Sequence, residues 1–63
     1  MTNTQKQMIL QAWAWCDAED KSTEFMLAYL SDISGVDYEE VTDYICSEEA
    51  EKDREAYYKN LNN

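Results

Sequence analysis

The chain contains very few residues that interrupt a helix: there is no proline and only one glycine among its 63 residues. Because these two residues are the strongest helix breakers, long helices joined by short turns are favoured and strands are not expected. A chain of this length makes one domain with a small core, burying only about 60% of the surface that its unfolded form exposes. We therefore expect a single acidic all-α domain over residues 1–63, with three helices, or four if the last segment forms a separate one.

The first predicted helix covers residues 4–17. Thr4 and Gln7 have the spacing of a capping box. Gln11 is the only polar residue between Met8 and Cys16, so this helix needs burial on more than one side. Its expected core positions are Ile9, Ala12, Trp13 and Cys16 together with Met8. Two outcomes are consistent with this pattern: a homodimer formed through the Met8 to Cys16 helix, or a monomer with one partly exposed tryptophan.

The second helix is expected to begin at a Ser22 or Thr23 cap and to stop at Gly35, where glycine tolerates a left-handed backbone. Asp37 and Glu40 have the spacing of a second capping box, which would start a third helix. The apolar stripe of the second helix consists of Phe25, Met26, Tyr29, Leu30 and Ile33, and that of the third consists of Val41, Tyr44 and Ile45.

The C-terminal segment after Ile45 remains strongly helix-prone but has few apolar residues. It either projects from the body or packs through Ala50, Tyr57 and Leu61. Opposite charges are set four residues apart in the favourable order at Glu48 with Lys52 and at Glu55 with Lys59.

The stretch from Leu30 to Ile45 resembles a helix-turn-helix, the module with which many transcription regulators place a second helix in the major groove of DNA. Gly35 stands at the turn position and Ser31 at the small-residue position, whereas Ser34 departs from the pattern. The apolar positions of the motif are occupied by Leu30, Val36, Val41 and Tyr44. The resemblance implies a helix-turn-helix-like hairpin.

The charge of the chain conflicts with the usual function of that motif. Fourteen acids against five bases give a formal net charge of −9. The helix that would meet DNA carries Asp37, Glu39, Glu40 and Asp43, which repel phosphate and cannot donate hydrogen bonds to bases. We therefore expect no direct binding to nucleic acid or to an anionic membrane, and attraction to basic proteins instead.

Our leading functional hypothesis is a small acidic binding protein that occupies a basic surface of a nucleic-acid-handling protein, with carboxylates standing in for phosphates. In size and charge it is similar to the small phage-encoded inhibitors that disable host nucleases or polymerases. Exposed aromatic residues would add affinity. The expected partner-binding residues are Asp37, Tyr38, Glu39, Glu40, Asp43, Glu48, Glu51, Glu55, Tyr57, Tyr58 and Trp15. The alternative is a homo-oligomeric structural or transcription-regulatory adaptor of the helix-turn-helix type.

Several other classes of function are disfavoured by the composition. Without histidine, the two thiols Cys16 and Cys46 cannot complete an ordinary zinc site, and we expect both to be reduced and to pack as small core residues. Paired carboxylates such as Glu39 and Asp43 have little room for an enclosed pocket in so small a body, so neither an enzyme nor a cofactor is expected. No apolar stretch is long enough for a membrane span or a secretory signal, which favours the cytoplasm, or the host cytoplasm for a phage protein.

Overall fold

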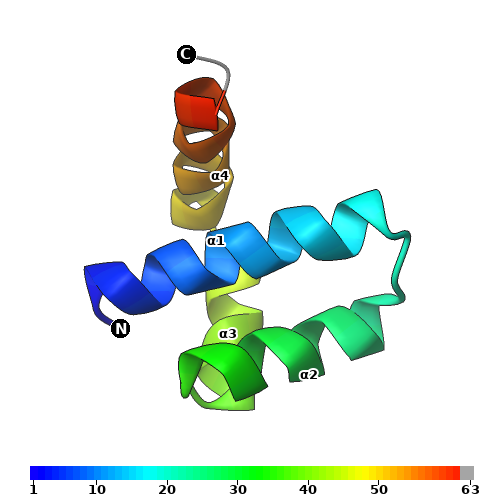
Figure 1. Ribbon diagram of the computed structural model, residues 1–63. Helices are drawn as coiled ribbons and strands as arrows, with labels where there is room; N and C mark the ends of the chain where they lie inside the picture. Colours follow the sequence, from blue (N-terminus) through cyan, green and yellow to red (C-terminus); the bar gives the residue numbers. More distant parts are fainter. Residues whose placement is uncertain (62–63) are drawn as a thin grey trace.

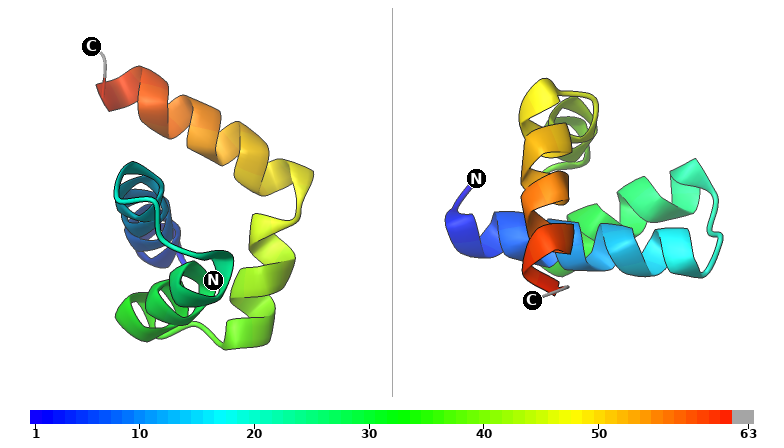
Figure 2. Two further views of the ribbon diagram at one scale, coloured as in Figure 1. Left: turned by 90° about the vertical axis from the view of Figure 1, so that its right-hand side faces the viewer. Right: turned by 90° about the horizontal axis from the view of Figure 1, so that it is seen from above.

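The computed structural model describes residues 1–61 as four α-helices: α1 (Asn3–Ala18), α2 (Thr23–Ser34), α3 (Tyr38–Ile45) and α4 (Glu48–Leu61) (Figure 1). α1 and α2 run antiparallel, α3 crosses at one end of the pair, and α4 slants back over α1 (Figure 2). Each helix thus packs on two others around a central core. The expectation of an all-α domain with a fourth helix is confirmed. Within residues 1–61, no helix combines the length and the apolar character needed to cross a bilayer.

α1 begins one residue earlier than predicted because Thr2, not Thr4, is its cap. The hydroxyl of Thr2 accepts a hydrogen bond from the backbone N–H of Gln5, and the Gln5 side chain accepts one from the N–H of Thr2. The Thr-x-x-Gln spacing occurs twice in succession, so the sequence alone does not choose between the two boxes. Gln5 also donates to the carbonyl of Ser34 at 3.3 Å, a contact with the end of α2 that favours the earlier register.

The turn between α2 and α3 is held by serines of α2. Gly35 ends α2 in the left-handed conformation with φ 72°, as predicted. The hydroxyl of Ser31 donates a hydrogen bond to the carbonyl of Val36. The buried hydroxyl of Ser34 accepts one from the backbone N–H of Val36. Asp37 occupies the cap position of α3 but makes no side-chain capping bond, so the predicted Asp37–Glu40 box is wrong. The hydrogen bonds from Ser31 and Ser34 of α2 therefore hold the chain before α3, where the capping box was expected.

Each helix contributes at least one fully buried side chain to the core. Ile9, Leu30, Val41 and Ala50 are all 0% exposed, and they come from α1, α2, α3 and α4 in that order. The other buried apolar residues are Leu10, Ala12, Trp13, Cys16, Met26, Val36 and Tyr44. Because one alanine places the start of α4 directly against the core, there is no room there for a larger side chain without displacing a neighbour.

Helix α4 is separate from α3. The chain leaves the helix at Cys46, and the hydroxyl of Ser47 then donates to the carbonyl of Tyr44 and accepts from the N–H of Ala50. Ala50 and Tyr57 pack against the core as predicted, but Leu61 is 60% exposed, so that part of the prediction is wrong. The far end of α4 extends beyond the other helices, where it has no neighbour to cover an apolar residue (Figure 1).

Two other core predictions hold only in part. Cys16 is buried, whereas Cys46 is exposed, and no disulfide joins them. Met8 on α1 and Phe25 and Ile33 on α2 belong to the predicted apolar stripes but are 37–44% exposed. Met8 and Ile33 instead line an open groove formed by residues of α1 and α2 alone.

Candidate functional site

We call the acidic surface the set of seven exposed acids that precede or lie on α3 and α4 and that the sequence predicts as partner-binding: Asp37, Glu39, Glu40, Asp43, Glu48, Glu51 and Glu55. Glu39 and Asp43 are one turn apart on α3. The three α4 residues are spaced i, i+3 and i+7, which places them along one face of that helix. The structure therefore arranges these acids as two rows on adjoining helices.

The two helices also share an open hollow of about 290 Å³. Glu40 and Asp43 of α3 line it, together with Glu49 of α4. Tyr44 and Lys6 form part of its wall. Acids from both helices therefore converge at the joint between α3 and α4.

Most of the carboxylates lack a positive partner within the described chain. Four of the fourteen take part in ion pairs within residues 1–61, namely Asp17, Glu40, Glu49 and Asp53. The other ten are exposed and unpaired, and six of these ten belong to the acidic surface. The expected ion pairs of Glu48 with Lys52 and of Glu55 with Lys59 are not formed in this part of the chain. Water and salt, not protein cations, therefore screen this charge.

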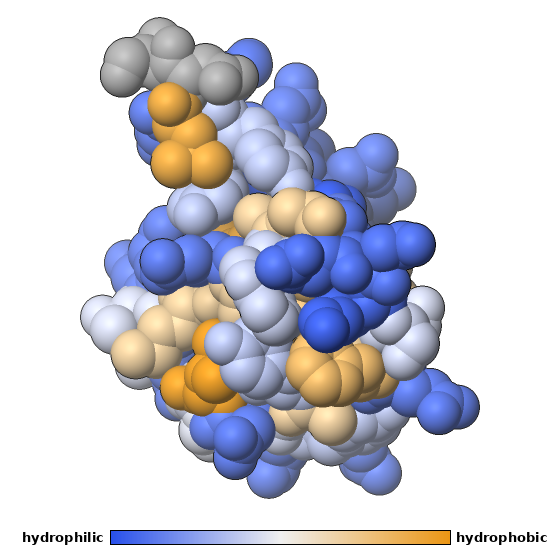
Figure 3. All heavy atoms as spheres, turned by 45° about the vertical axis from the view of Figure 1, so that its right-hand side comes forward, coloured by the Kyte–Doolittle hydropathy of each residue, from blue (hydrophilic) through white to orange (hydrophobic). Residues whose placement is uncertain are grey.

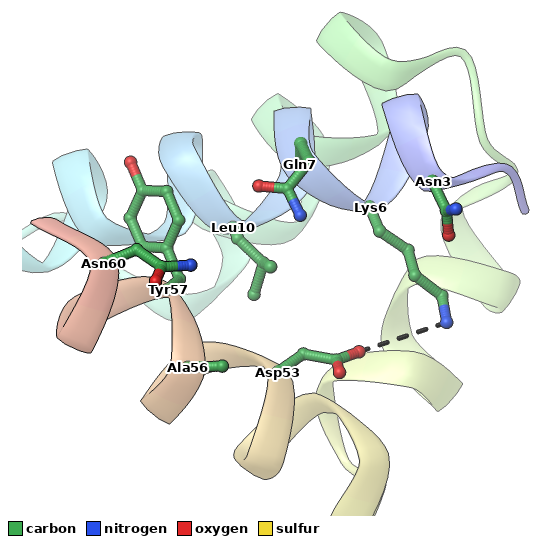
Figure 4. Close-up of a pocket in the computed structure, with 8 residues that line it drawn as sticks. All are labelled: Asn3, Lys6, Gln7, Leu10, Asp53, Ala56, Tyr57 and Asn60. Carbon is green, nitrogen blue, oxygen red and sulfur yellow. Dashed lines mark ion pairs between the residues drawn. The ribbon is translucent and has the colours of Figure 1, made fainter.

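Lys6 is turned inward to support the joint between α1, α3 and α4. Its ammonium lies 3.5 Å from Glu49. It also lies 4.0 Å from Asp53 (Figure 4). Asp53 in turn accepts a hydrogen bond of 2.7 Å from the hydroxyl of Tyr44. Burial raises the pKa of Tyr44, and the bond to Asp53 and the charges of Asp53 and Glu49 raise it further. The cleft beside this network, of about 180 Å³, lies between α1 and α4 and includes Gln7 and Tyr57 (Figure 4).

Arg54, the only arginine of the chain, also forms no ion pair with the acidic surface in the described structure. Its guanidinium carbon lies 4.3 Å from the centroid of the Trp13 ring and 5.5 Å from that of Tyr58, and the group forms an ion pair with Asp17. Nε of Arg54 is buried without a hydrogen-bond partner in the described structure. Sequence reasoning missed this role, although a single arginine beside so many acids was a usable signal.

The predicted aromatic contacts do not form one group. Tyr38 and Tyr58 are 47% and 37% exposed on α3 and α4, near the acids. Tyr57 is half-buried against the core, and its ring centroid lies 5.9 Å from that of Tyr58 in an edge contact. Its ring therefore packs within the domain. Trp15 contacts Tyr29 at 5.4 Å on the α1–α2 side instead of joining the acidic surface. The acidic surface thus has two exposed tyrosines, not four exposed aromatic residues.

Apolar and hydrophilic residues are interspersed on the outside of the molecule. On the face shown in Figure 3, several separate apolar areas lie among hydrophilic side chains. Within residues 1–61, no group of three or more acids or thiols has the geometry of a metal site. Comparison of the chain with protein-family models, with curated proteins and with solved structures gave no match.

Proposed function

We propose that this protein is a small acidic binding protein whose α3–α4 side occupies a basic surface of a nucleic-acid-handling protein. The observation that supports the proposal best is the unpaired state of the carboxylates. Six acids of the acidic surface are exposed without a cation, while Lys6 and Arg54 are engaged with other acids or with aromatic rings. Their charge remains available to a partner.

The mechanism is occlusion of a phosphate-binding surface. Rows of carboxylates on a rigid helix can meet lysines and arginines that otherwise contact a nucleic-acid backbone. Opposite net charges accelerate the encounter, and this acceleration decreases as salt increases. Tyr38 and Tyr58 supply aromatic contact area next to the acids, which is the kind of residue that contributes most affinity in protein interfaces.

The attachment of α4 to the core and to α1 supports this mechanism. Ala50 is fully buried at its start, and Arg54 joins its middle to α1 through Trp13 and Asp17. A helix held in this way presents its acids at fixed spacing, so less conformational entropy is lost on binding than with a disordered acidic tail.

The test compares two variants that have the same net charge. The first removes four charges from the acidic surface: Glu39→Gln, Asp43→Asn, Glu48→Gln and Glu55→Gln. The control removes four from exposed, unpaired acids elsewhere: Glu19→Gln, Asp20→Asn, Glu24→Gln and Asp32→Asn. A tagged chain isolates the partner from the source cell, and the affinity of the purified partner is then measured for all three forms.

We expect the first variant to bind at least about 4-fold more weakly, because four surface charge contacts of about 0.2–1 kcal/mol each are lost. The control should stay within about 3-fold of the unmodified chain. The partner should bind nucleic acid and release it when this protein is added. Equal losses in both variants, or tight binding of the unmodified chain to bare duplex DNA at about 0.15 M salt, would refute the proposal.

A further inference from the structure

We propose that the groove between α1 and α2 is a homodimer interface, and that its occupant is the same groove of a second copy of this chain. The groove has a volume of about 320 Å³ and lies away from the acidic surface. Its walls are Met8, Gln11, Ala12 and Trp15 from α1 and Tyr29 and Ile33 from α2.

Large apolar side chains are concentrated along this groove and continue past its end. Met8 and Trp15 are 43% and 44% exposed, and Ile33 is 37% exposed. Phe25, 44% exposed, extends the apolar strip by stacking on Tyr29 at 5.9 Å. An isolated exposed apolar residue needs no explanation, but a continuous strip of this kind indicates a contact surface.

The chemistry of the groove is suited to pairing with itself. In a twofold dimer, each residue near the axis meets its own copy, so a carboxylate there would face a carboxylate. None of the six residues lining the groove is charged. Apolar groups pair with their like, and the Gln11 amide both donates and accepts hydrogen bonds. The only charged residue between Asn3 and Cys16 is Lys6, which is turned toward Glu49 and Asp53.

Charge also argues against the basic partner of the proposed function at this position. A basic surface would find no carboxylate lining the groove, and it would meet the ammonium of Lys21, which lies 5.6 Å from the Trp15 ring and 5.3 Å from the Phe25 ring. Two copies of a chain with a net charge of −9 repel each other, and a contact centred on this groove brings no lining carboxylate of one copy against the other.

The size of the molecule fits a modest dimer. One chain exposes 4434 Å², and an interface at the low end of the specific range covers about 600 Å² on each partner. Two helices from each copy would then form a four-helix arrangement around the shared groove. We therefore expect a dimer that dissociates on dilution.

Sedimentation equilibrium tests the proposal, with samples from about 10 μM to about 1 mM. The unmodified chain should pass from its own mass of 7.4 kDa toward twice that value. Gln11→Glu should weaken dimerisation at least about 10-fold, because it places two like charges across the twofold axis. The matched control is Gln7→Glu, which adds the same charge to the same helix but at the α1–α4 cleft, and it should have an effect below about 3-fold.

Salt provides a second measurement. Raising the salt concentration should strengthen this dimer by screening the repulsion between like-charged copies, whereas it should weaken binding to a basic partner. A chain that remains at 7.4 kDa throughout the range overturns the proposal, whatever else binds in the groove. A dimer that Gln7→Glu and Gln11→Glu weaken equally, or that neither weakens, places the interface elsewhere and also overturns it. Both glutamines are exposed, so circular dichroism should show an unchanged fold for both variants.

Discussion

Replacement of Arg54 by alanine should loosen α4 from the rest of the domain. The guanidinium lies over Trp13 at 4.3 Å, in a partly desolvated position where a cation–π contact stabilises by about 1–2 kcal/mol. The ion pair with Asp17 adds at most about 1 kcal/mol, because the Asp17 side chain is 48% exposed. The buried Nε without a partner offsets about 1 kcal/mol of these gains.

The net expectation for Arg54→Ala is a loss of about 2 kcal/mol, which includes the packing of the side-chain stem over Trp13. For a domain of this size, this loss corresponds to a decrease in Tm of about 8–16 °C. Two further variants separate the contributions. Asp17→Asn removes only the ion pair and should cost less than about 1 kcal/mol. Arg54→Met keeps much of the stem and removes the unpaired N–H, so it should cost about half as much as alanine.

Urea unfolding measures these differences when it is followed in parallel by far-ultraviolet circular dichroism and by tryptophan fluorescence. The near-ultraviolet signal should also change in Arg54→Ala, because Trp13 loses its stacked partner. If Arg54→Ala lowers the free energy of unfolding by less than about 0.5 kcal/mol, the arginine does not hold α4. If Asp17→Asn is as destabilising as Arg54→Ala, the ion pair, not the stacking, is responsible.

Four other predictions follow from particular residues. Gly35→Ala should lower the free energy of unfolding by about 1–2 kcal/mol because a φ of 72° is unfavourable to alanine, although the added Cβ would meet nothing within 4 Å. Thermal unfolding measures this loss, and an unchanged Tm would contradict it. A thiol reagent should modify exposed Cys46 quickly and buried Cys16 only as the fold opens, so equal rates would contradict the burial of Cys16. Burial raises the pKa of both Cys16 and Tyr44, so above about pH 9–10 the unfolded chain loses protons that the folded chain retains. The free energy of unfolding should therefore fall as the pH rises through this range, and Tyr44→Phe should reduce the fall. Added KCl should raise the Tm by screening the unpaired carboxylates, and a decreasing Tm would show that the ion pairs dominate.

The site was predictable from sequence as a set of acids but not as an arrangement. The charges of Glu39, Asp43 and Glu55 can be read directly, and helical spacing gives their faces. Whether a cation neutralises them depends on where Arg54 and Lys6 point, which is decided by contacts between residues far apart in the chain. For the same reason Trp15 was grouped with the acids, whereas the structure places it against Tyr29.

The sequence by itself determined that this protein is helical, that α2 stops at Gly35 and that acids predominate after it. These properties depend on backbone preferences, on spacing within one helix and on composition, all of which are local. The tertiary structure decided that Thr2 caps α1, that Ser34 holds the turn, and which apolar residues stay outside the core. The register of α1 and the exposed apolar residues depend on contacts between separate helices, and Ser34 holds the turn with a hydroxyl that is buried only in the folded chain. A core this small is filled by one side of each helix, so the strip on the other side of α1 and α2 remains exposed.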